Sequence, residues 1–63
     1  MKKYFRKDKP KQDQIIVFKA VKAFYPEIGV FQMFDNGTEE VYIPANDDTE
    51  PLINIEWWSE VPM

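Results

Sequence analysis

The turn sequence Asp35-Asn36-Gly37, set between two strand-like runs, restricts the fold more than any other feature of this chain. Residues 29–34 before it and residues 38–43 after it are rich in β-branched and aromatic side chains, which favour strands. Asparagine followed by glycine supplies the positive φ angles that a tight hairpin turn requires. The pattern therefore predicts a β-hairpin over residues 29–43.

Two registers compete for this hairpin. A two-residue turn at Asn36-Gly37 pairs Phe34 with Glu39 and mixes apolar and polar side chains on one face. A three-residue loop that begins at Asp35 pairs Phe34 with Thr38 and leaves the glycine left-handed in a bulge. We favour the second register because it separates apolar from polar side chains more cleanly. It places Phe31, Met33, Val41 and Ile43 on one face, and Val30, Gln32, Phe34, Thr38, Glu40 and Tyr42 on the other.

Two more segments have strand character. The run from Gln14 is mostly β-branched or aromatic and favours a strand, although Lys19–Ala23 is a tolerable short helix. Pro44 ends the hairpin, and the acidic, turn-forming residues 45–51 predict a loop. Residues 52–61 alternate as a final strand. One side of that strand carries Ile53, Ile55, Trp57 and Val61, and the other carries Asn54, Glu56, Trp58 and Glu60.

The expected fold class is mainly β, with a four-stranded antiparallel sheet or small open barrel preceded by a basic N-terminal arm. Residues 1–13 are polar and Lys-rich and predict a flexible arm, which Tyr4 and Phe5 could anchor. Residues 14–63 form the single small domain. A chain of this length buries only about 60% of its unfolded surface, so we expect its two Trp, three Tyr and five Phe to supply a dense core.

Composition argues against catalysis. The chain has no Cys and no His, which excludes disulfides and thiolate metal sites and removes the commonest metal ligand and general base. Ser59 is the only serine, and no histidine is present to activate it. Two glycines are too few for a phosphate-binding loop. We therefore expect no enzymatic activity, no cofactor and no bound metal.

Charge is sorted along the chain. Eight basic and two acidic residues give the first 22 residues a formal charge of +6, and nine acids without a base give the remainder −9. Such asymmetry reports on partners and association rather than on fold. Here it also suggests a contact between the arm and the acidic body, within one chain or between two.

Trp57 and Trp58 are adjacent, so on a strand they point to opposite faces. We assign Trp57 to the core and Trp58 to the acidic surface, where an exposed tryptophan is typical of an interface anchor. The alternative is that Trp58 covers a second small core under the N-terminal arm. The first assignment predicts a mixed aromatic and acidic surface suited to a basic partner or to dimerisation. Its residues are Phe34, Glu40, Tyr42, Glu56, Trp58 and Glu60.

These features predict a non-enzymatic protein-binding module whose partner is a host or viral protein with a basic surface, or a second copy of the chain. A first alternative is a small nucleic-acid-binding protein whose arm contacts phosphates through Lys2, Lys3, Arg6 and Lys7. A second is a DNA-mimic inhibitor that presents the acidic body to a nucleic-acid-binding host protein. No apolar run is long enough to span a membrane and no export signal is visible, so we expect a cytoplasmic protein.

Two segments carry a family resemblance. The first is Pro10-Lys-Gln-Asp-Gln-Ile-Ile-Val-Phe18, and the second is Ile55-Glu-Trp-Trp-Ser-Glu-Val-Pro62. Together they resemble the opening and closing strands of a small β-rich domain family of unknown function found in phage and prophage proteins. The resemblance covers most of residues 9–62, but the family's usual histidine near Glu56 is absent. It implies a compact β-rich accessory domain in a viral setting and no catalytic residues. Together with the features above, it favours a phage-encoded inhibitor or accessory protein.

Overall fold

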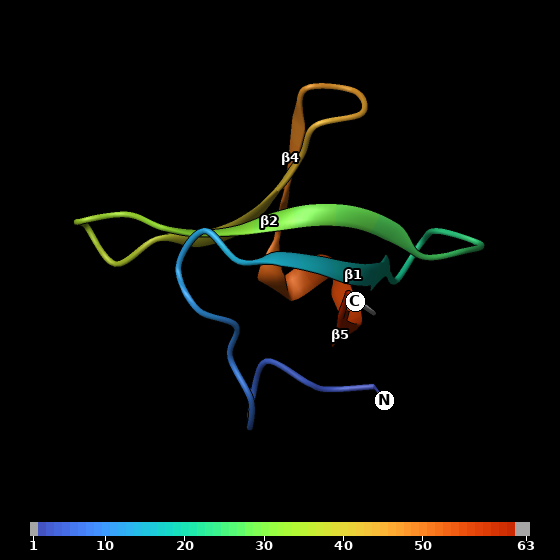
Figure 1. The fold of residues 1–63 in the computed structure, drawn as a ribbon, viewed down its shortest axis with the longest axis horizontal. Coiled ribbons are helices and arrows are strands. Elements are labelled where there is room, and N and C mark those ends of the chain that lie inside the picture. The colour runs from blue at the N-terminus through green and yellow to red at the C-terminus, as the bar shows by residue number, and fades with distance from the viewer. Residues whose placement is uncertain (1, 62–63) are drawn as a thin grey trace.

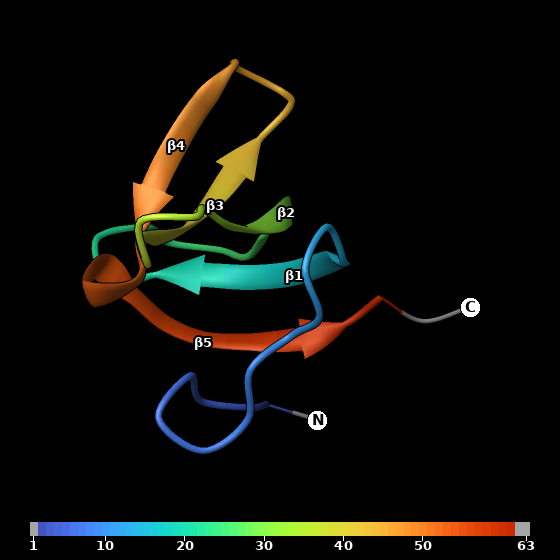
Figure 2. The same cartoon turned by 90° about the vertical axis from the view of Figure 1, so that its left-hand side faces the viewer.

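The computed structural model describes residues 2–61, which form one antiparallel sheet with the strand order β4-β3-β2-β1-β5 (Figure 1). The strands are β1 (Ile15–Ala20), β2 (Glu27–Met33), β3 (Glu39–Ile43), β4 (Asp48–Pro51) and β5 (Ile55–Glu60). A 3-10 turn, η1 (Leu52–Asn54), precedes β5. The mainly β, antiparallel class is confirmed. Figure 2 shows the sheet curling, with β3 and β4 leaning away from β1 and β5.

The hairpin of β2 and β3 has the predicted three-residue loop. Phe31 pairs with Val41 and Met33 pairs with Glu39. The Phe34 amide donates to the Thr38 carbonyl at 2.9 Å. Gly37 has a φ of +86°, the left-handed conformation that this bulged turn requires. Both the register and the role of the glycine are confirmed.

The prediction of four strands is wrong, because β4 forms within the segment expected to be a loop. Asp48 to Pro51 pairs along β3, with Thr49 opposite Tyr42 and Glu50 opposite Val41. Asp and Pro have low strand propensity, so the segment carries little strand signal of its own. Pairing with β3 overrides that propensity, and the left-handed Asp47, at a φ of 52°, allows the tight turn before it.

The assignment of the two tryptophans is reversed by a β-bulge. β1 pairs with β5 at Lys19–Trp57 and next at Ala20–Ile55, so Glu56 is an extra residue in β5. The extra residue moves every later side chain to the opposite face. Ile55 and Trp58 therefore share the core, where the Trp58 side chain is only 2% exposed, and Trp57 is half-buried on the other face.

One face of the sheet, called the inner face below, holds the core. Its buried side chains are Ile16, Phe18, Phe31, Val41, Ile43, Ile55 and Trp58. Gly29 lies on the same face, opposite Ile16, and makes room for the larger side chains around it. Ile53, predicted to face the core, instead lies on η1 and is almost fully exposed.

Substituting Gly29 by alanine should lower the free energy of unfolding by about 1–3 kcal/mol, the usual cost of overpacking a core. A Cβ atom there would lie 2.8 Å from Phe18 Cε1 and would also clash with Val41 Cγ1. Urea denaturation measures the loss as a lower midpoint. Gly37→Ala is the comparison: its Cβ would meet no atom within 4 Å, and only the positive φ strains it. A Gly29→Ala protein as stable as the wild type would contradict this packing.

The predicted flexible arm is packed against the sheet instead. Lys3 and Trp58 exchange two backbone hydrogen bonds, of 2.6 and 2.9 Å, so the arm adds a short bridge to the outer edge of β5. The Phe5 ring stacks on Phe31 with a centroid distance of 5.8 Å and contacts the Trp58 ring at 6.1 Å. Pro10 is buried. Residues 2–10 therefore complete the core, and the alternative that placed Trp58 under the arm agrees with the structure.

Candidate functional site

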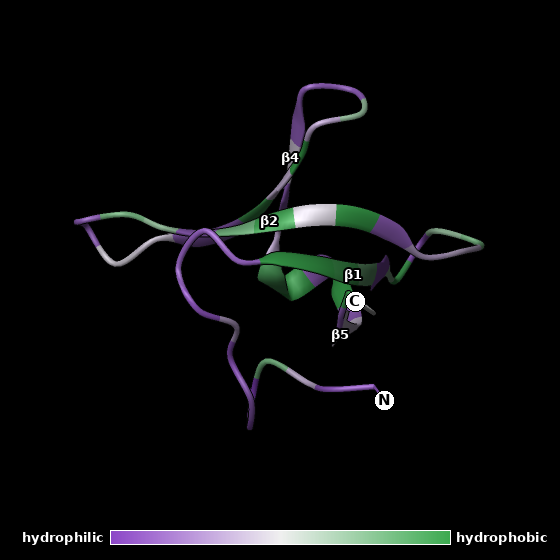
Figure 3. Cartoon of the chain, in the orientation of Figure 1, coloured by the Kyte–Doolittle hydropathy of each residue, from purple (hydrophilic) through white to green (hydrophobic). Residues whose placement is uncertain are grey.

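The face opposite the core, called the outer face below, is apolar along its centre. Cross-strand pairing brings Ile15 beside Val30, and Val30 beside Tyr42 on β3. Val17 lies beside Ile28 on the neighbouring pair of the same two strands. Figure 3 shows that β1 and the middle of β2 consist mostly of hydrophobic residues, in contrast to the mostly hydrophilic arm and β4. The band is incompletely covered, since about half of the Ile15 and Ile28 surfaces remain exposed.

Three of the six predicted partner-binding residues lie on this outer face. Phe34, 47% exposed, follows the end of β2, and Gln32 separates it from Val30 along the outer face. Glu40 lies opposite Gln32, and Tyr42 lies opposite Val30. The Tyr42 hydroxyl donates a hydrogen bond of 2.7 Å to Asp47, which raises the pKa of the tyrosine because the proton is held by the carboxylate. The predicted aromatic and acidic face therefore exists for these three side chains.

Trp57 and Glu56 border the outer face at β5. The Lys2 ammonium lies 5.1 Å from the centre of the Trp57 ring, a cation–π distance. Lys19 donates to Glu56 at 2.9 Å. This border is therefore occupied by contacts within the chain, and Glu56 is not a free carboxylate.

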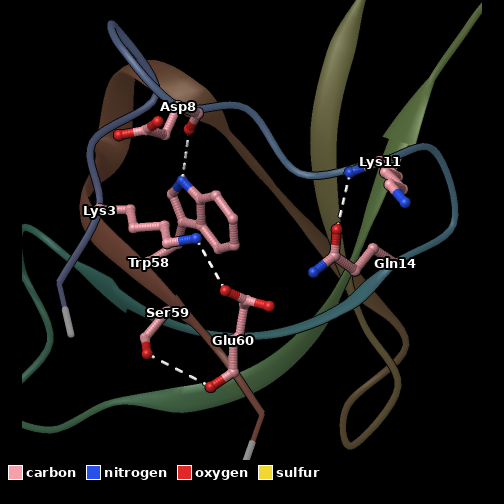
Figure 4. A network of polar contacts seen from close by, with 7 residues as sticks. All are labelled: Lys3, Asp8, Lys11, Gln14, Trp58, Ser59 and Glu60. Atoms are coloured by element: carbon pink, nitrogen blue, oxygen red, sulfur yellow. Dashed lines mark hydrogen bonds and ion pairs between the residues drawn. The ribbon is translucent and has the colours of Figure 1, made fainter.

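Trp58 and Glu60, the other two predicted residues, lie on the inner face beside the arm (Figure 4). Trp58 is buried there, so its assignment to the exposed surface is wrong, whereas Glu60 is exposed but faces away from Phe34, Glu40 and Tyr42. The Trp58 indole N–H donates to the Asp8 carbonyl at 2.7 Å. Lys3 donates to Glu60 at 2.8 Å, and its ammonium lies 5.1 Å from the Trp58 ring centre. These polar contacts attach the arm to β5, and they leave Trp58 no surface for a partner.

The Lys3–Glu60 pair shifts both pKa values in the direction that favours the charged forms. The hydrogen bond from Lys3 lowers the pKa of Glu60, and the same bond raises the pKa of Lys3. Because the pKa of Glu60 is lower in the folded than in the unfolded protein, the ion pair stabilises the fold at pH values above the unfolded pKa. This contribution is lost as the pH falls through the folded pKa. Because both groups are solvent-exposed, the pair attaches the arm only weakly.

The four predicted nucleic-acid-binding cations are not equally available. Lys3 is engaged with Glu60 and Lys2 with the Trp57 ring. Arg6 and Lys7 are exposed, and with Tyr4 they line a shallow cavity beside the arm's turn. Half of the predicted phosphate contacts therefore compete with contacts inside the chain.

The acids are also partly neutralised. Glu39, Glu56 and Glu60 bind Lys9, Lys19 and Lys3, respectively, at 2.8–3.0 Å. Strand pairing places Glu39 and Glu50 on the inner face and Glu40 on the outer face. Carboxylates on opposite faces do not form one continuous row like the phosphates of a nucleic-acid strand. This arrangement argues against the DNA-mimic alternative.

Comparison with known proteins gives no family for this chain: no family model, no curated protein and no solved structure matches it. The resemblance to the phage domain family therefore stays a prediction. Within residues 2–61, no three or more Asp and Glu side chains are grouped closely enough to hold a metal ion. None of the helical segments described is long and apolar enough to cross a membrane.

Sequence reasoning missed Ile15 and Ile28 as surface residues. The β-branched Ile15 was correctly predicted to lie in a strand, but it was indistinguishable from a core residue because it adjoins the buried Ile16. Ile28 was assigned to a turn over residues 25–29, and this assignment is wrong because β2 begins at Glu27. The signal for Ile28 was Pro26, which ends the preceding turn and fixes where β2 begins. Without the β1–β2 register, the face could not be chosen.

Proposed function

We propose that this protein is a non-enzymatic binding module that holds another protein against its outer face. The observation that carries this proposal is the exposed apolar band of that face around Ile15 and Ile28, with Phe34 exposed further along the same face. Contiguous exposed apolar surface on a small domain is typical of interaction sites. The chain has no His or Cys to supply the common catalytic groups, and the Glu residues adjacent in β3 face opposite sides of the sheet.

The chemistry of the outer face defines the kind of partner it can bind. The partner's contact surface should be apolar at the centre and should carry a Lys or Arg at the margin. Within residues 2–61, Glu40 takes part in no ion pair and lies at the edge of the band, while Lys19, a cation at the far end of β1, is already bound to Glu56. The resemblance to phage domains supports an inhibitor or accessory protein as the biological setting.

Cross-linking from the outer face tests the proposal. A photoreactive phenylalanine analogue at position 34 should capture one partner protein in the native cell, and the same analogue at Tyr4 should not. The two positions are matched because both are aromatic and about half exposed, at 47% and 50%. Ile28→Ser should then weaken binding of the purified partner about tenfold, equivalent to about 1.4 kcal/mol. Titration calorimetry measures the affinity, with Tyr4→Ser as the control.

Two results would overturn the proposal. The first is unchanged affinity of Ile28→Ser in a protein whose circular dichroism is that of the wild type. The second is a dimer in light scattering that becomes monomeric on Phe34→Ser, which would make a second copy the occupant of the outer face.

A further inference from the structure

A second candidate site lies at one end of the sheet, away from the outer face. A cavity of about 400 Å³ opens where β1 ends, β2 begins and η1 follows β4. The Val21 amide donates to the Asn54 carbonyl at 2.8 Å, which holds the loop after β1 against η1. Figure 2 shows this loop and η1 side by side at the same end of the sheet. We call this cavity the end pocket. Its volume falls in the range of about 300–1,000 Å³ that ligand pockets usually have.

Two carboxylates line the end pocket from the inner face of the sheet. Glu27 pairs with Phe18, and Glu50 pairs with Val41. Both of these partners are fully buried core residues, so the glutamates continue the core face to its margin. Both glutamates are half-buried, and among residues 2–61 neither forms an ion pair. Each carboxylate can therefore form a charge-assisted hydrogen bond with a cationic group of a bound molecule.

The remaining wall of the pocket is mostly apolar. Ala20, Val21, Ala23 and Ile53 contribute to it, together with one cation, Lys22. Ile53 is 88% exposed on η1, and Phe24, on the loop that forms the pocket, is 94% exposed. No buried contact in the described chain uses these large apolar side chains. They can therefore cover the aliphatic stem of a long basic side chain and the apolar residues next to it.

From this geometry we infer that the end pocket binds an arginine or lysine side chain, flanked by apolar residues, from a segment of another protein. The cationic group pairs with Glu27 and Glu50, and the apolar neighbours contact Val21 and Ile53. Charge complementarity decides the occupant, because the pocket presents two unpaired carboxylates against one cation. The inference does not depend on the proposed function, since the outer face contributes no residue to this pocket.

A pair of short peptides tests the inference. The probe is acetyl-Leu-Arg-Leu-amide, and its control replaces arginine by the uncharged isostere citrulline. In two-dimensional NMR titrations of the labelled full chain, the arginine peptide should shift the amide signals of residues 20–27 and 50–54. The citrulline peptide should bind at least fivefold more weakly. Raising the salt concentration should reduce the difference between the two peptides.

Substitutions distinguish binding in the end pocket from nonspecific attraction of the peptide to the acidic protein. The double variant Glu27→Gln, Glu50→Gln should bind the arginine peptide at least fivefold more weakly, while Asp13→Asn, which removes an exposed acid from the turn before β1, should bind it as the wild type does. Equal binding of both peptides, no binding, or shifts confined to other residues would overturn the inference. If the wild type forms dimers that the double substitution Arg6→Glu, Lys7→Glu removes, the pocket's occupant is the arm of a second copy, and the inference of another protein is wrong.

Discussion

Replacing Trp58 by alanine should leave the protein mostly unfolded at 25 °C. Truncating a fully buried tryptophan costs about 3–5 kcal/mol, and a single core of this size rarely supplies more than about 3–5 kcal/mol in total. The ring contacts Phe5, its N–H binds the Asp8 carbonyl, and only 2% of its surface is exposed. Far-UV circular dichroism and the dispersion of amide NMR signals measure the loss.

Trp57→Ala is the matched control, because it removes the same side chain from the adjacent residue. Trp57 is half-buried on the opposite face, so its truncation should cost about 1 kcal/mol or less and should keep the native spectrum. Urea denaturation compares the two variants where both retain a folded baseline. A larger loss for Trp57→Ala than for Trp58→Ala would show that the β5 bulge is misplaced and that Trp57 is the core residue.

Deleting residues 2–9 should lower the free energy of unfolding by about 3 kcal/mol or more, which is enough to abolish the folded state. The deletion removes the Phe5 ring from the core, the carbonyl that accepts the Trp58 N–H, and the backbone bridge at Lys3. Loss of the partly buried Phe5 costs less than the about 3–5 kcal/mol of a fully buried phenylalanine, but the deletion also leaves the outer edge of β5 unpaired beside an uncovered Trp58 ring. Thermal unfolding and light scattering measure the loss of structure and the resulting aggregation.

The control retains the arm and removes only its free charges. Arg6→Ser with Lys7→Ser changes two exposed side chains and should alter stability by no more than about 0.5 kcal/mol. The same variant is also the valid test of nucleic-acid binding, because a deletion would confuse lost phosphate contacts with lost folding. An arm-deleted protein with wild-type stability would contradict the packed arm.

The sequence was sufficient for features that local chemistry determines. Gly37 was identified because few other residues tolerate a positive φ in a hairpin turn, and the cleaner separation of apolar from polar side chains selected the register of β2 and β3. The outer-face position of Phe34, Glu40 and Tyr42 followed from that register. The side chains of the first strand also predicted β1 correctly, but its end at Ala20 was not marked by any breaker residue.

The errors arise where partners distant in sequence decide the structure. β4 exists because β3 offers it an edge, and its own residues favour a turn. Glu56 bulges because β5 must pair with β1 after η1, and this single extra residue exchanged the places of Trp57 and Trp58. The basic residues of the arm predicted a solvated segment, whereas Phe5 and Pro10, which contribute to the core, were too few to predict its packing.

The bridge between the arm and β5 also has a consequence for the order of folding. Lys3 and Glu60 are 57 residues apart, whereas β1, β2 and β3 pair with their sequence neighbours. Closing so long a loop costs more chain entropy than forming a hairpin, so the β1–β2–β3 meander should form first and the two ends should pair last. Until that step, the aromatic core is open to solvent along β5, and the unpaired strand is exposed to other chains. Pairing of the arm at Lys3 with β5 is thus the step that completes folding.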